Sequence, residues 1–589
     1  MKTVRLTKLL SRHGAVALVF LLALAFFTAT ASYNYLTQDA SYRKWNSPDE
    51  TANYFFADRF ARTGEIASFE RINLIAHDLV HPRSMRSDQG WLKPVSFLGI
   101  VVLYGALGQL FSPTIIPFLT PFFAALGILA MYGFASRFFS KRVGVISAAL
   151  LASFPVYIFY SVRSMFHNVL FLVCLLFFAW LLALAWEKRR QKEISFFTPW
   201  AGRAVWLGNL SAFLAGLALA AAVSVRTSEL IWLGPALGLL WLFNLRRFGL
   251  AKFLFLLSGL GAGLIPVAYF NQLLFGSPIF GGYVEMNRSL EAISQAGGQI
   301  VHGWEAAKGF LETLFNNVFY FGFKWRQSWE MFQHYAIEMF PTLFWLAILG
   351  GFLLIFKSFS RSRRRDYLYI FLLLAVSAVL VVYYGSWKFH DNPNISRYTI
   401  GNSYTRYWLP MYAFALPLGA LAVASIARTL SSWIKGRGKS LIFSIICVLA
   451  VGVISYQGVM FTLFGSEEGL VNLYHESLYE RDNVSKLLQV IEPEAVVVTQ
   501  YHDKYLFPER RVIVGLLTDD NMNRYYSLVA QKAPLYYYNF TFPNQDIQYL
   551  NGQRLPAFGL RIEPVERIDR AFTLYRLLPV GGDSVPTRQ

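Results

Sequence analysis

Two neighbouring carboxylates follow the first long apolar segment of this chain. The residues Ser47-Pro48-Asp49-Glu50 open a polar stretch in a sequence that is otherwise mostly apolar. A carboxylate held just outside a membrane can take a proton from a hydroxyl group brought to it. The structural alternative is that Pro48 begins a helix and the acids complement the partial positive charge of its first turn. Asp49 and Glu50 are therefore the candidate catalytic residues.

Apolar side chains at helical spacing follow these acids. Tyr54, Ala57 and Phe60 continue an amphipathic helix that is expected to end at Gly64, because glycine readily adopts the conformation that closes a helix. Such a helix lies along the membrane surface. It would hold the two acids at its start.

Several basic residues are candidates for contact with an anionic headgroup. Lys93 directly precedes an apolar segment, and three arginines lie at the predicted outer ends of apolar runs. The positive-inside rule does not favour positive charge at the outer ends of membrane spans. Binding of a lipid phosphate would explain why these arginines lie there. Each side chain could equally be an interfacial anchor. The predicted substrate-binding residues are Lys93, Arg163, His167, Arg226, Arg406 and Tyr407.

Metal chemistry is not expected. His77, Asp78 and His81 group metal-ligating side chains, but His81 precedes Pro82, which disfavours helical spacing of the two histidines. Both cysteines lie inside apolar runs, which excludes a disulfide framework and a cysteine-based metal site. The sequence therefore predicts no cofactor.

The composition is that of a membrane protein. Of 589 residues, 55% are hydrophobic and 15% charged, whereas soluble domains carry roughly 25% charged residues. Apolar runs of about 20 residues, long enough to span a bilayer, recur through most of the chain. We expect a mostly α-helical, multi-pass protein with about 11 transmembrane helices. Their predicted positions are 14–32, 114–136, 144–160, 165–186, 204–225, 229–245, 253–270, 337–356, 367–385, 408–427 and 441–464.

Basic side chains decide the predicted orientation. The net charge of +19 comes mainly from short connectors, which favours the positive-inside rule over nucleic-acid binding. Five basic clusters lie at 137–142, 188–192, 246–252, 357–365 and 435–439. All five face the cytoplasm only if the apolar segment 94–111 lies along the interface. This places the N-terminus in the cytoplasm and the C-terminus outside a plasma (inner) membrane.

The last part of the chain has the composition of a soluble domain. Helical character is expected at 483–491, and β-rich segments predict strands at 495–499, 511–514 and 534–538. We therefore expect two domains. A transmembrane domain at 1–464 includes a first outer loop at about 33–113. A small extracytoplasmic α/β domain, without an evident catalytic group, covers 465–589.

These features together resemble the GT-C glycosyltransferases that use polyprenyl-phosphate sugars, in particular protein O-mannosyltransferases and lipid A aminoarabinose transferases. The matching features are Pro48-Asp49-Glu50 with Tyr54 and Gly64, Lys93-Pro94, the connector 137–145, Ser153-Phe154-Pro155 with Arg163, and Arg406-Tyr407 with Pro410. The resemblance covers about residues 10–190 and thins toward 430. It implies a GT-C fold with interfacial helices in the first outer loop.

The resemblance also implies roles for individual residues. Asp49 matches the catalytic base, with Glu50 beside it, and Lys93 and Arg226 match groups near the lipid phosphate. Relatives often carry an aspartate in the second outer loop, where this chain has His167-Asn168. The paired acids of metal-using oligosaccharyltransferases are missing there, which argues against a catalytic divalent ion.

The resulting hypothesis is an inverting sugar transfer from a polyprenyl phosphate to a hydroxyl acceptor on a lipid, glycan or protein, outside the membrane. Its alternative is a transporter or flippase of lipid-linked sugars. Transporters usually place charged residues near the bilayer midplane and often show repeats, and neither is visible in this sequence. A membrane receptor or scaffold would not need the loop around Asp49.

Overall fold

The computed structural model describes two compact units. The described residues are 2–38, 43–187, 203–298, 304–319, 322–359, 364–389, 391, 397–434, 438–465 and 467–580. The first unit comprises Met1–Asn34, Phe118–Tyr269 and Val284–Leu473. The second comprises Tyr35–Pro117, Phe270–Tyr283 and Tyr474–Gln589. The basic connector 188–192 and several residues of the connectors at 357–365 and 435–439 lie outside the described residues.

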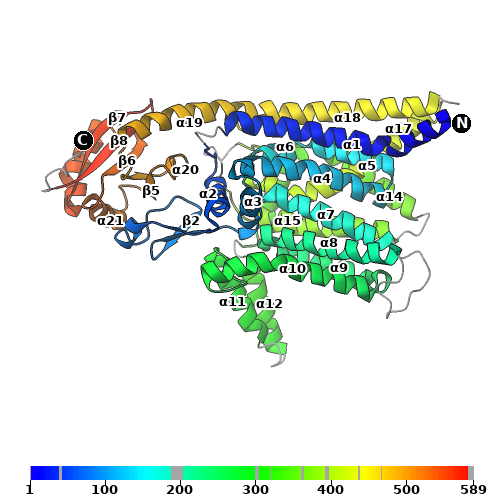
Figure 1. Cartoon of the computed structure of the whole chain (residues 1–589), viewed down its shortest axis with the longest axis horizontal. Coiled ribbons are helices and arrows are strands. Elements are labelled where there is room, and N and C mark those ends of the chain that lie inside the picture. The colour runs from blue at the N-terminus through cyan, green and yellow to red at the C-terminus, as the bar shows by residue number, and fades with distance from the viewer. Residues whose placement is uncertain are drawn as a thin grey trace. The chain divides into compact units, whose positions relative to one another are not determined.

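The first unit is a bundle of helices, of which α7 and α8 lie side by side in Figure 1. Helices wholly or mainly in this unit are α1 (Lys2–Thr37), α4 (Ile116–Phe138), α5 (Lys141–Ala152), α6 (Pro155–Val162), α7 (His167–Glu187), α8 (Arg203–Val225), α9 (Leu230–Phe248), α10 (Leu250–Phe275), α11 (Val284–Gly298), α12 (Trp304–Val318), α13 (Trp325–Phe332), α14 (Pro341–Phe359), α15 (Arg364–Gly385), α16 (Ser403–Tyr407), α17 (Leu409–Ser431) and α18 (Gly438–Phe464).

Length and apolar composition make this unit a multi-pass membrane domain. Among the described residues, nine helices are long and apolar enough to cross a bilayer. The pair α5 and α6 adds a tenth candidate, bent by 53° at its break. Pro155 explains the break, because proline removes a backbone donor and disfavours helical geometry in the residue before it. The helical membrane fold is confirmed, whereas the number eleven stays a prediction.

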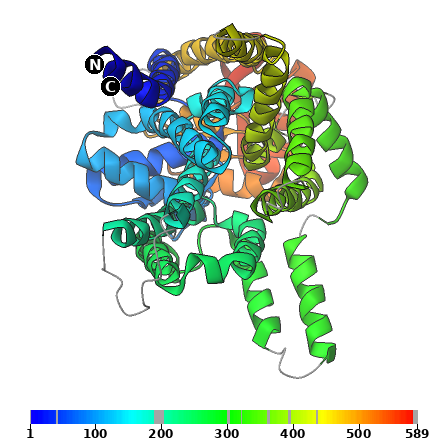
Figure 2. The same cartoon turned by 90° about the vertical axis from the view of Figure 1, so that its right-hand side faces the viewer.

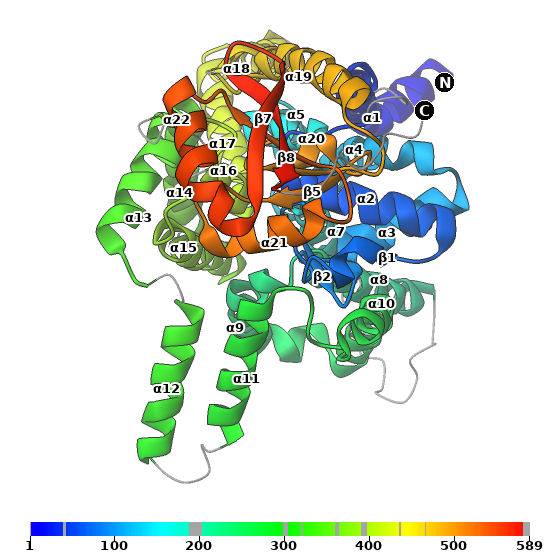
Figure 3. The same ribbon diagram turned by 90° about the vertical axis from the view of Figure 1, so that its left-hand side faces the viewer.

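Two glycines let α8 and α10 pack closely. A Cβ atom on Gly216 would lie 2.1 Å from the carbonyl oxygen of Leu256, and one on Gly259 would lie 2.0 Å from that of Phe213. Small residues at such crossings are the usual means of helix association in membranes. The helices α11 and α12 differ, because Figures 2 and 3 show them side by side, extending away from the rest of the bundle.

The second unit begins with Tyr35–Pro117, the segment predicted to be the first outer loop. The helix α2 (Pro48–Thr63) ends at Gly64 with φ 76°, which confirms the predicted helix and its glycine cap. A small antiparallel sheet follows, in the order β1 (Ser68–Phe69), β3 (Trp91–Pro94), β2 (Met85–Asp88). The helix α3 (Leu98–Leu110) has 13 residues, about 20 Å of helix against a bilayer core of roughly 30 Å. It is therefore too short to cross.

The same unit contains a five-stranded sheet built by the C-terminal part of the chain. Its order is β5 (Arg511–Val514), β4 (Val496–Thr499), β6 (Leu535–Phe540), β8 (Phe572–Pro579), β7 (Leu560–Arg567). The first three strands are parallel, and β7 and β8 form an antiparallel hairpin. The helices are α19 (Leu470–Val490), α20 (Asp503–Leu506), α21 (Asp520–Ala530) and α22 (Asn544–Tyr549).

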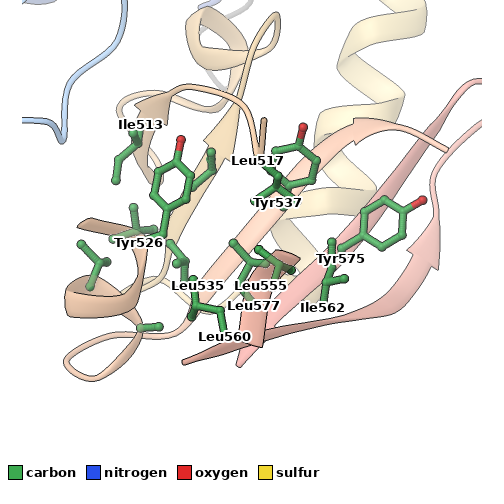
Figure 4. Close-up of a cluster of buried hydrophobic side chains, with 14 of the residues drawn as sticks. Ile513, Leu517, Tyr526, Leu535, Tyr537, Leu555, Leu560, Ile562, Tyr575 and Leu577 are labelled. Atoms are coloured by element: carbon green, nitrogen blue, oxygen red, sulfur yellow. The ribbon is translucent and has the colours of Figure 1, made fainter. Parts of the chain in front are cut away.

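One face of this sheet carries a hydrophobic core. Figure 4 shows Tyr526 of α21, Tyr537 of β6 and Tyr575 of β8 among the buried aliphatic side chains of this core. Ile72 and Val80 of the first outer loop belong to the same core. The first outer loop and the C-terminal sheet are thus one folded body. The predicted domain division at residue 465 stays a prediction.

Candidate functional site

Asp49 lies in the first turn of α2, and Glu50 follows it. Pro48 fixes the start of the helix, and no side chain caps it at Ser47. The Asp49 carboxylate is half-buried and accepts a hydrogen bond from the Ser84 hydroxyl. Glu50 is only 1% exposed. Of the two predicted acids, Asp49 is therefore the one that solvent and a substrate can reach.

Ser84 holds this position at the cost of an unusual backbone conformation. Its φ is 62°, in the left-handed region that non-glycine residues seldom adopt. The preceding Arg83 fixes the loop: its backbone N–H donates to Asp503 over 2.8 Å and its Nε donates to the same carboxylate over 3.0 Å. Asp503 is fully buried. The contact to Asp49 therefore depends on an anchor at the start of α20.

A second contact holds the segment before α2. The Lys44 ammonium donates to the backbone oxygen of Phe507 over 2.7 Å and pairs with the Glu509 carboxylate. Burial lowers the pKa of Lys44, and Glu509 opposes that shift. Lys504 adds a hydrogen bond of 2.6 Å to the backbone oxygen of Asn46. The segment that leads into Asp49 is thus bound at several points to the loop around α20.

Lys93 lies on β3 in the same unit as Asp49. Its ammonium pairs with Asp88 over 2.7 Å, and its side chain is 15% exposed. On the neighbouring strand it faces Arg86, whose guanidinium lies 4.8 Å from the ring centre of Phe275. Two cations therefore occupy adjacent cross-strand positions. A phosphate at Lys93 would have to compete with the Asp88 carboxylate.

The segment from His77 to His81 shapes a turn. Burial raises the pKa of Asp78, but hydrogen bonds from Ser87, Gln89 and Gly90 outweigh it and hold the pKa below its usual value. Across the part of the chain that the structure describes, no group of three or more histidine, cysteine or acidic side chains could hold a metal ion.

In the first unit, two predicted arginines share one aromatic ring. The guanidinium of Arg163 lies 5.0 Å from the ring centre of Phe166, and that of Arg406 lies 4.3 Å from it. His167 begins α7 and is buried, and the Asn168 amide donates to the backbone oxygen of Arg406 over 3.0 Å. Two positive charges from distant parts of the sequence are thus held close together.

Arg226 belongs to a neighbouring buried cluster. Its guanidinium pairs with Glu229 over 2.7 Å, donates to the Tyr384 hydroxyl over 3.1 Å and lies 4.7 Å from the ring centre of Tyr407. Tyr407 in turn stacks on Tyr384 with ring centres 4.4 Å apart. The indole of Trp232 donates to the other oxygen of Glu229. Glu229 therefore neutralises Arg226.

An apolar cavity of about 450 Å³ lies inside the same unit. Trp232 and Pro410 line it, and these residues are within three positions of Glu229 and Tyr407. Arg137 and Arg365 line it as well. The cavity thus joins the Arg226 cluster to an apolar volume between helices, a combination suited to a lipid with a charged headgroup.

The structure therefore places the predicted residues in two sets. Asp49, Glu50 and Lys93 lie in the second unit, and the remaining predicted residues lie in the first. Sequence reasoning missed Ser84, Asp503 and Glu229. Glu229 had a usable signal, an acid three positions after an arginine, whereas the other two act across large sequence separations.

Comparison with known proteins identifies a related family and fold. Residues 103–270 match the family model described as dolichyl-phosphate-mannose-protein mannosyltransferase. The fold is similar to the oligosaccharyltransferase AglB of Archaeoglobus fulgidus in complex with an inhibitory peptide and a dolichol-phosphate (TM-score 0.52, 12% identity, 92% of this chain and 70% of that chain). No curated protein sequence matches the chain.

Two further solved structures are similar. The apo form of the same archaeal enzyme has a TM-score of 0.51 at 13% identity, over 93% of this chain and 71% of that chain. ArnT of Cupriavidus metallidurans bound to undecaprenyl phosphate has a TM-score of 0.48 at 12% identity, over 94% of this chain and 97% of that chain. The family match and the fold of AglB together confirm the predicted resemblance to GT-C glycosyltransferases.

Proposed function

We propose that this chain, a multi-pass membrane glycosyltransferase with the GT-C fold, moves one sugar from a polyprenyl-phosphate donor to a hydroxyl acceptor at the outer membrane surface. The matched family model describes an enzyme of a dolichyl-phosphate sugar, and AglB was solved with a dolichol-phosphate. Both support a donor that consists of a sugar, a phosphate and a long apolar tail.

The observation that carries the proposal is the pair of guanidinium groups on Phe166. Arg163 and Arg406 approach the same ring to 5.0 Å and 4.3 Å, and guanidinium groups bind phosphate through charge-assisted hydrogen bonds. The apolar cavity begins within a helical turn of Tyr407 and can accept the tail. Phosphate and tail are thereby bound by neighbouring parts of one unit.

Lys93 and Arg226 have a different role from Arg163 and Arg406 in this proposal. Each has a carboxylate partner, Asp88 and Glu229 respectively, and a phosphate ligand would have to replace it. We assign the main phosphate contact to Arg163 and Arg406 because both guanidinium groups lie against the Phe166 ring. Arg226 supports the stacked tyrosines beside them, and Lys93 supplies positive potential near the acceptor.

The proposed reaction is a single displacement. The acceptor oxygen attacks the anomeric carbon, the bond from that carbon to the phosphate oxygen breaks, and the acceptor proton passes to Asp49. The hydrogen bond from Ser84 orients the Asp49 carboxylate. The lipid phosphate leaves as a weak base, so no general acid is needed, and the arginines stabilise its growing charge. One displacement inverts the anomeric configuration.

The test is transfer by an Asp49→Asn variant in lipid nanodiscs. Loss of a general base lowers rates by roughly 10²–10⁴, so transfer should fall by that factor while binding of the polyprenyl phosphate is retained. Asp546→Asn, an exposed acid on α22 of the same unit, should keep full activity. Near-normal turnover of Asp49→Asn would remove Asp49 from the role of base.

Transport without chemistry is the competing function. A flippase would move the labelled donor across the bilayer and release no lipid phosphate, whereas the proposed enzyme releases one lipid phosphate for each sugar transferred.

Labelling of a cysteine introduced beside Asp49 with an impermeant reagent tests the proposed orientation, with the C-terminal part outside. Labelling from the cytoplasmic side alone would contradict it.

A further inference from the structure

A separate cavity of about 260 Å³ lies in the second unit, along the helix that carries Asp49. One face of α2 lines it, together with the residues just before α2 and the loop after α20. Aromatic rings form much of its wall: Trp45 packs against Tyr54 with ring centres 5.7 Å apart, and Phe55 packs against Phe507 at 4.8 Å. Its volume lies below the roughly 300–1,000 Å³ of drug-sized pockets. It suits a single sugar ring.

The charges around this cavity do not cancel. Arg62 forms two hydrogen bonds to Asp58, of 2.6 Å and 3.0 Å, and Arg59 pairs with Glu65 over 2.9 Å. Arg43 also lines the cavity, but within the described ranges it forms no ion pair. Its Nη1 donates to the Tyr54 hydroxyl over 2.9 Å. Counted over the described residues, one net positive charge therefore remains, at Arg43.

Two hydrogen-bond donors of residues that line the cavity have no acceptor among the described residues. The Nε of Arg43 and the indole Nε1 of Trp45 are buried, and neither has a hydrogen-bond partner among the residues that the structure describes. Trp45 is only 3% exposed. Guanidinium and indole nitrogens can only donate, and a buried donor without an acceptor destabilises the folded protein. Both donors require acceptor oxygens, and the positive charge favours anionic ones.

We propose that this cavity binds an oxyanion, a carboxylate or a phosphate, on a sugar of the acceptor, and thereby selects an acidic glycan as the acceptor; this rests on the function proposed above. Arg43 and Trp45 both line the cavity, and the guanidinium and the indole together offer donors for the two oxygens that either group presents. The aromatic walls offer apolar faces to the sugar ring. The loop after α20 completes the cavity through Phe507, which gives the C-terminal part of the chain a share in substrate choice.

The place of the cavity on α2 suits an acceptor. Tyr54 is five positions after Asp49, about 7.5 Å along the helix axis, and Thr51 at the end of the cavity is two positions after it. A sugar anchored through its anionic group at Arg43 would extend along the helix toward its first turn. Asp49 itself is not among the residues that line the cavity, so the glycan must pass around the first turn of α2 for a hydroxyl of that sugar or the next to meet the Asp49 carboxylate.

Calorimetric titration of the full-length protein in nanodiscs tests the proposal. Methyl glucuronide and glucose 6-phosphate supply the carboxylate and the phosphate, and methyl glucoside is the neutral match. We expect one or both charged sugars to bind and the glucoside not to bind. Arg43→Gln and Trp45→Phe should each weaken binding roughly 10- to 100-fold, the effect of one charge-assisted hydrogen bond. Arg71→Gln, at an exposed arginine in the same unit, should bind like the parent protein.

Three results would overturn the proposal: equal binding of the glucoside, unchanged affinity of Arg43→Gln, or binding of neither charged sugar. Trp45→Phe retains an aromatic ring, so it remains informative if Arg43→Gln does not fold. The binding test is independent of catalysis, because Asp49→Asn should bind the charged sugars normally while losing transfer. A failure of the cavity proposal is therefore distinguishable from a failure of the proposed enzyme activity.

Discussion

Glu480 and His502 form a buried pair whose effect on stability should be hidden in the parent protein and visible in single variants. Their side chains are 14% and 9% exposed, and Glu480 Oε2 lies 4.0 Å from His502 Nε2. Burial raises the pKa of Glu480 to about 7 and lowers that of His502 to about 4. Although the geometry is within range of an ion pair, both shifts favour a neutral acid beside a neutral imidazole at mildly acid pH.

The two shifts act on stability with opposite signs. Because the pKa of Glu480 rises from 4.5 to about 7 on folding, the folded state binds more protons between these values and stability falls as pH rises. Because the pKa of His502 drops from 6.5 to about 4, the folded state binds fewer protons there and stability rises with pH. Each shift spans about 2.5 pH units, or about 3 kcal/mol at 1.36 kcal/mol per unit. Between pH 4.5 and 6.5 the two effects cancel.

Single substitutions should therefore separate the two effects. In Glu480→Gln the free energy of opening of β4 and β6 should rise by up to about 3 kcal/mol between pH 4 and 6.5. In His502→Gln it should fall by a similar amount between pH 4.5 and 7. Hydrogen exchange of the full-length protein, followed by mass spectrometry and corrected for the intrinsic pH dependence of exchange, measures both. Asp482→Asn, an exposed acid on α19, is the matched control and should follow the parent profile.

The reasoning fails if both variants keep the flat profile of the parent protein between pH 4.5 and 6.5. It also fails if Glu480→Gln becomes less stable as pH rises. Only His502 of the pair titrates in that variant, and its lowered pKa should make stability rise with pH.

Three further substitutions test the contacts that hold each unit. Glu229→Gln leaves the buried charge of Arg226 without its carboxylate and should destabilise the protein by about 3–5 kcal/mol. The midpoint of thermal unfolding should therefore fall. An unchanged midpoint would mean that the guanidinium is solvated. Arg83→Gln similarly leaves the fully buried Asp503 carboxylate without its guanidinium partner. It should lower transfer as well as stability, because it releases the loop that orients the proposed base; normal kcat would contradict this coupling. Gly259→Val should separate α8 from α10, read out as a loss of folded protein in detergent, whereas wild-type yield would show that the close crossing is dispensable.

The sequence predicts the elements that local patterns determine. The helix from Pro48 to its cap at Gly64 follows from a proline start, helical spacing and a glycine end, and the structure has it at those bounds. The three parallel strands follow from short runs of β-branched and aromatic residues between turn signals. The hairpin of β7 and β8 was not predicted, because Pro564 and the bulge beside it interrupt the alternation expected of a strand.

Long-range contacts account for what the sequence could not predict at the site. The types of Asp49, Arg163 and Arg406 pointed to acid–base chemistry and phosphate binding, but the Phe166 ring that joins two of them is visible only in the fold. Ser84 gives no local signal, since its role depends on a left-handed backbone conformation. Its loop is held by Asp503, which is 420 positions from Arg83 in the sequence.

The C-terminal part of the chain acquires a role from these contacts, although the proposed mechanism assigns it no reacting group. Asp503 fixes the loop that orients the proposed base, Glu509 fixes the segment that leads into α2, and Phe507 completes the cavity proposed for the acceptor. All three lie within one short stretch around α20. A region that reads as a separate soluble domain therefore forms one body with the first outer loop. Substitutions around α20 should change the position of Asp49 and the choice of acceptor, while the apolar cavity and the guanidinium pair of the first unit remain able to bind the lipid phosphate.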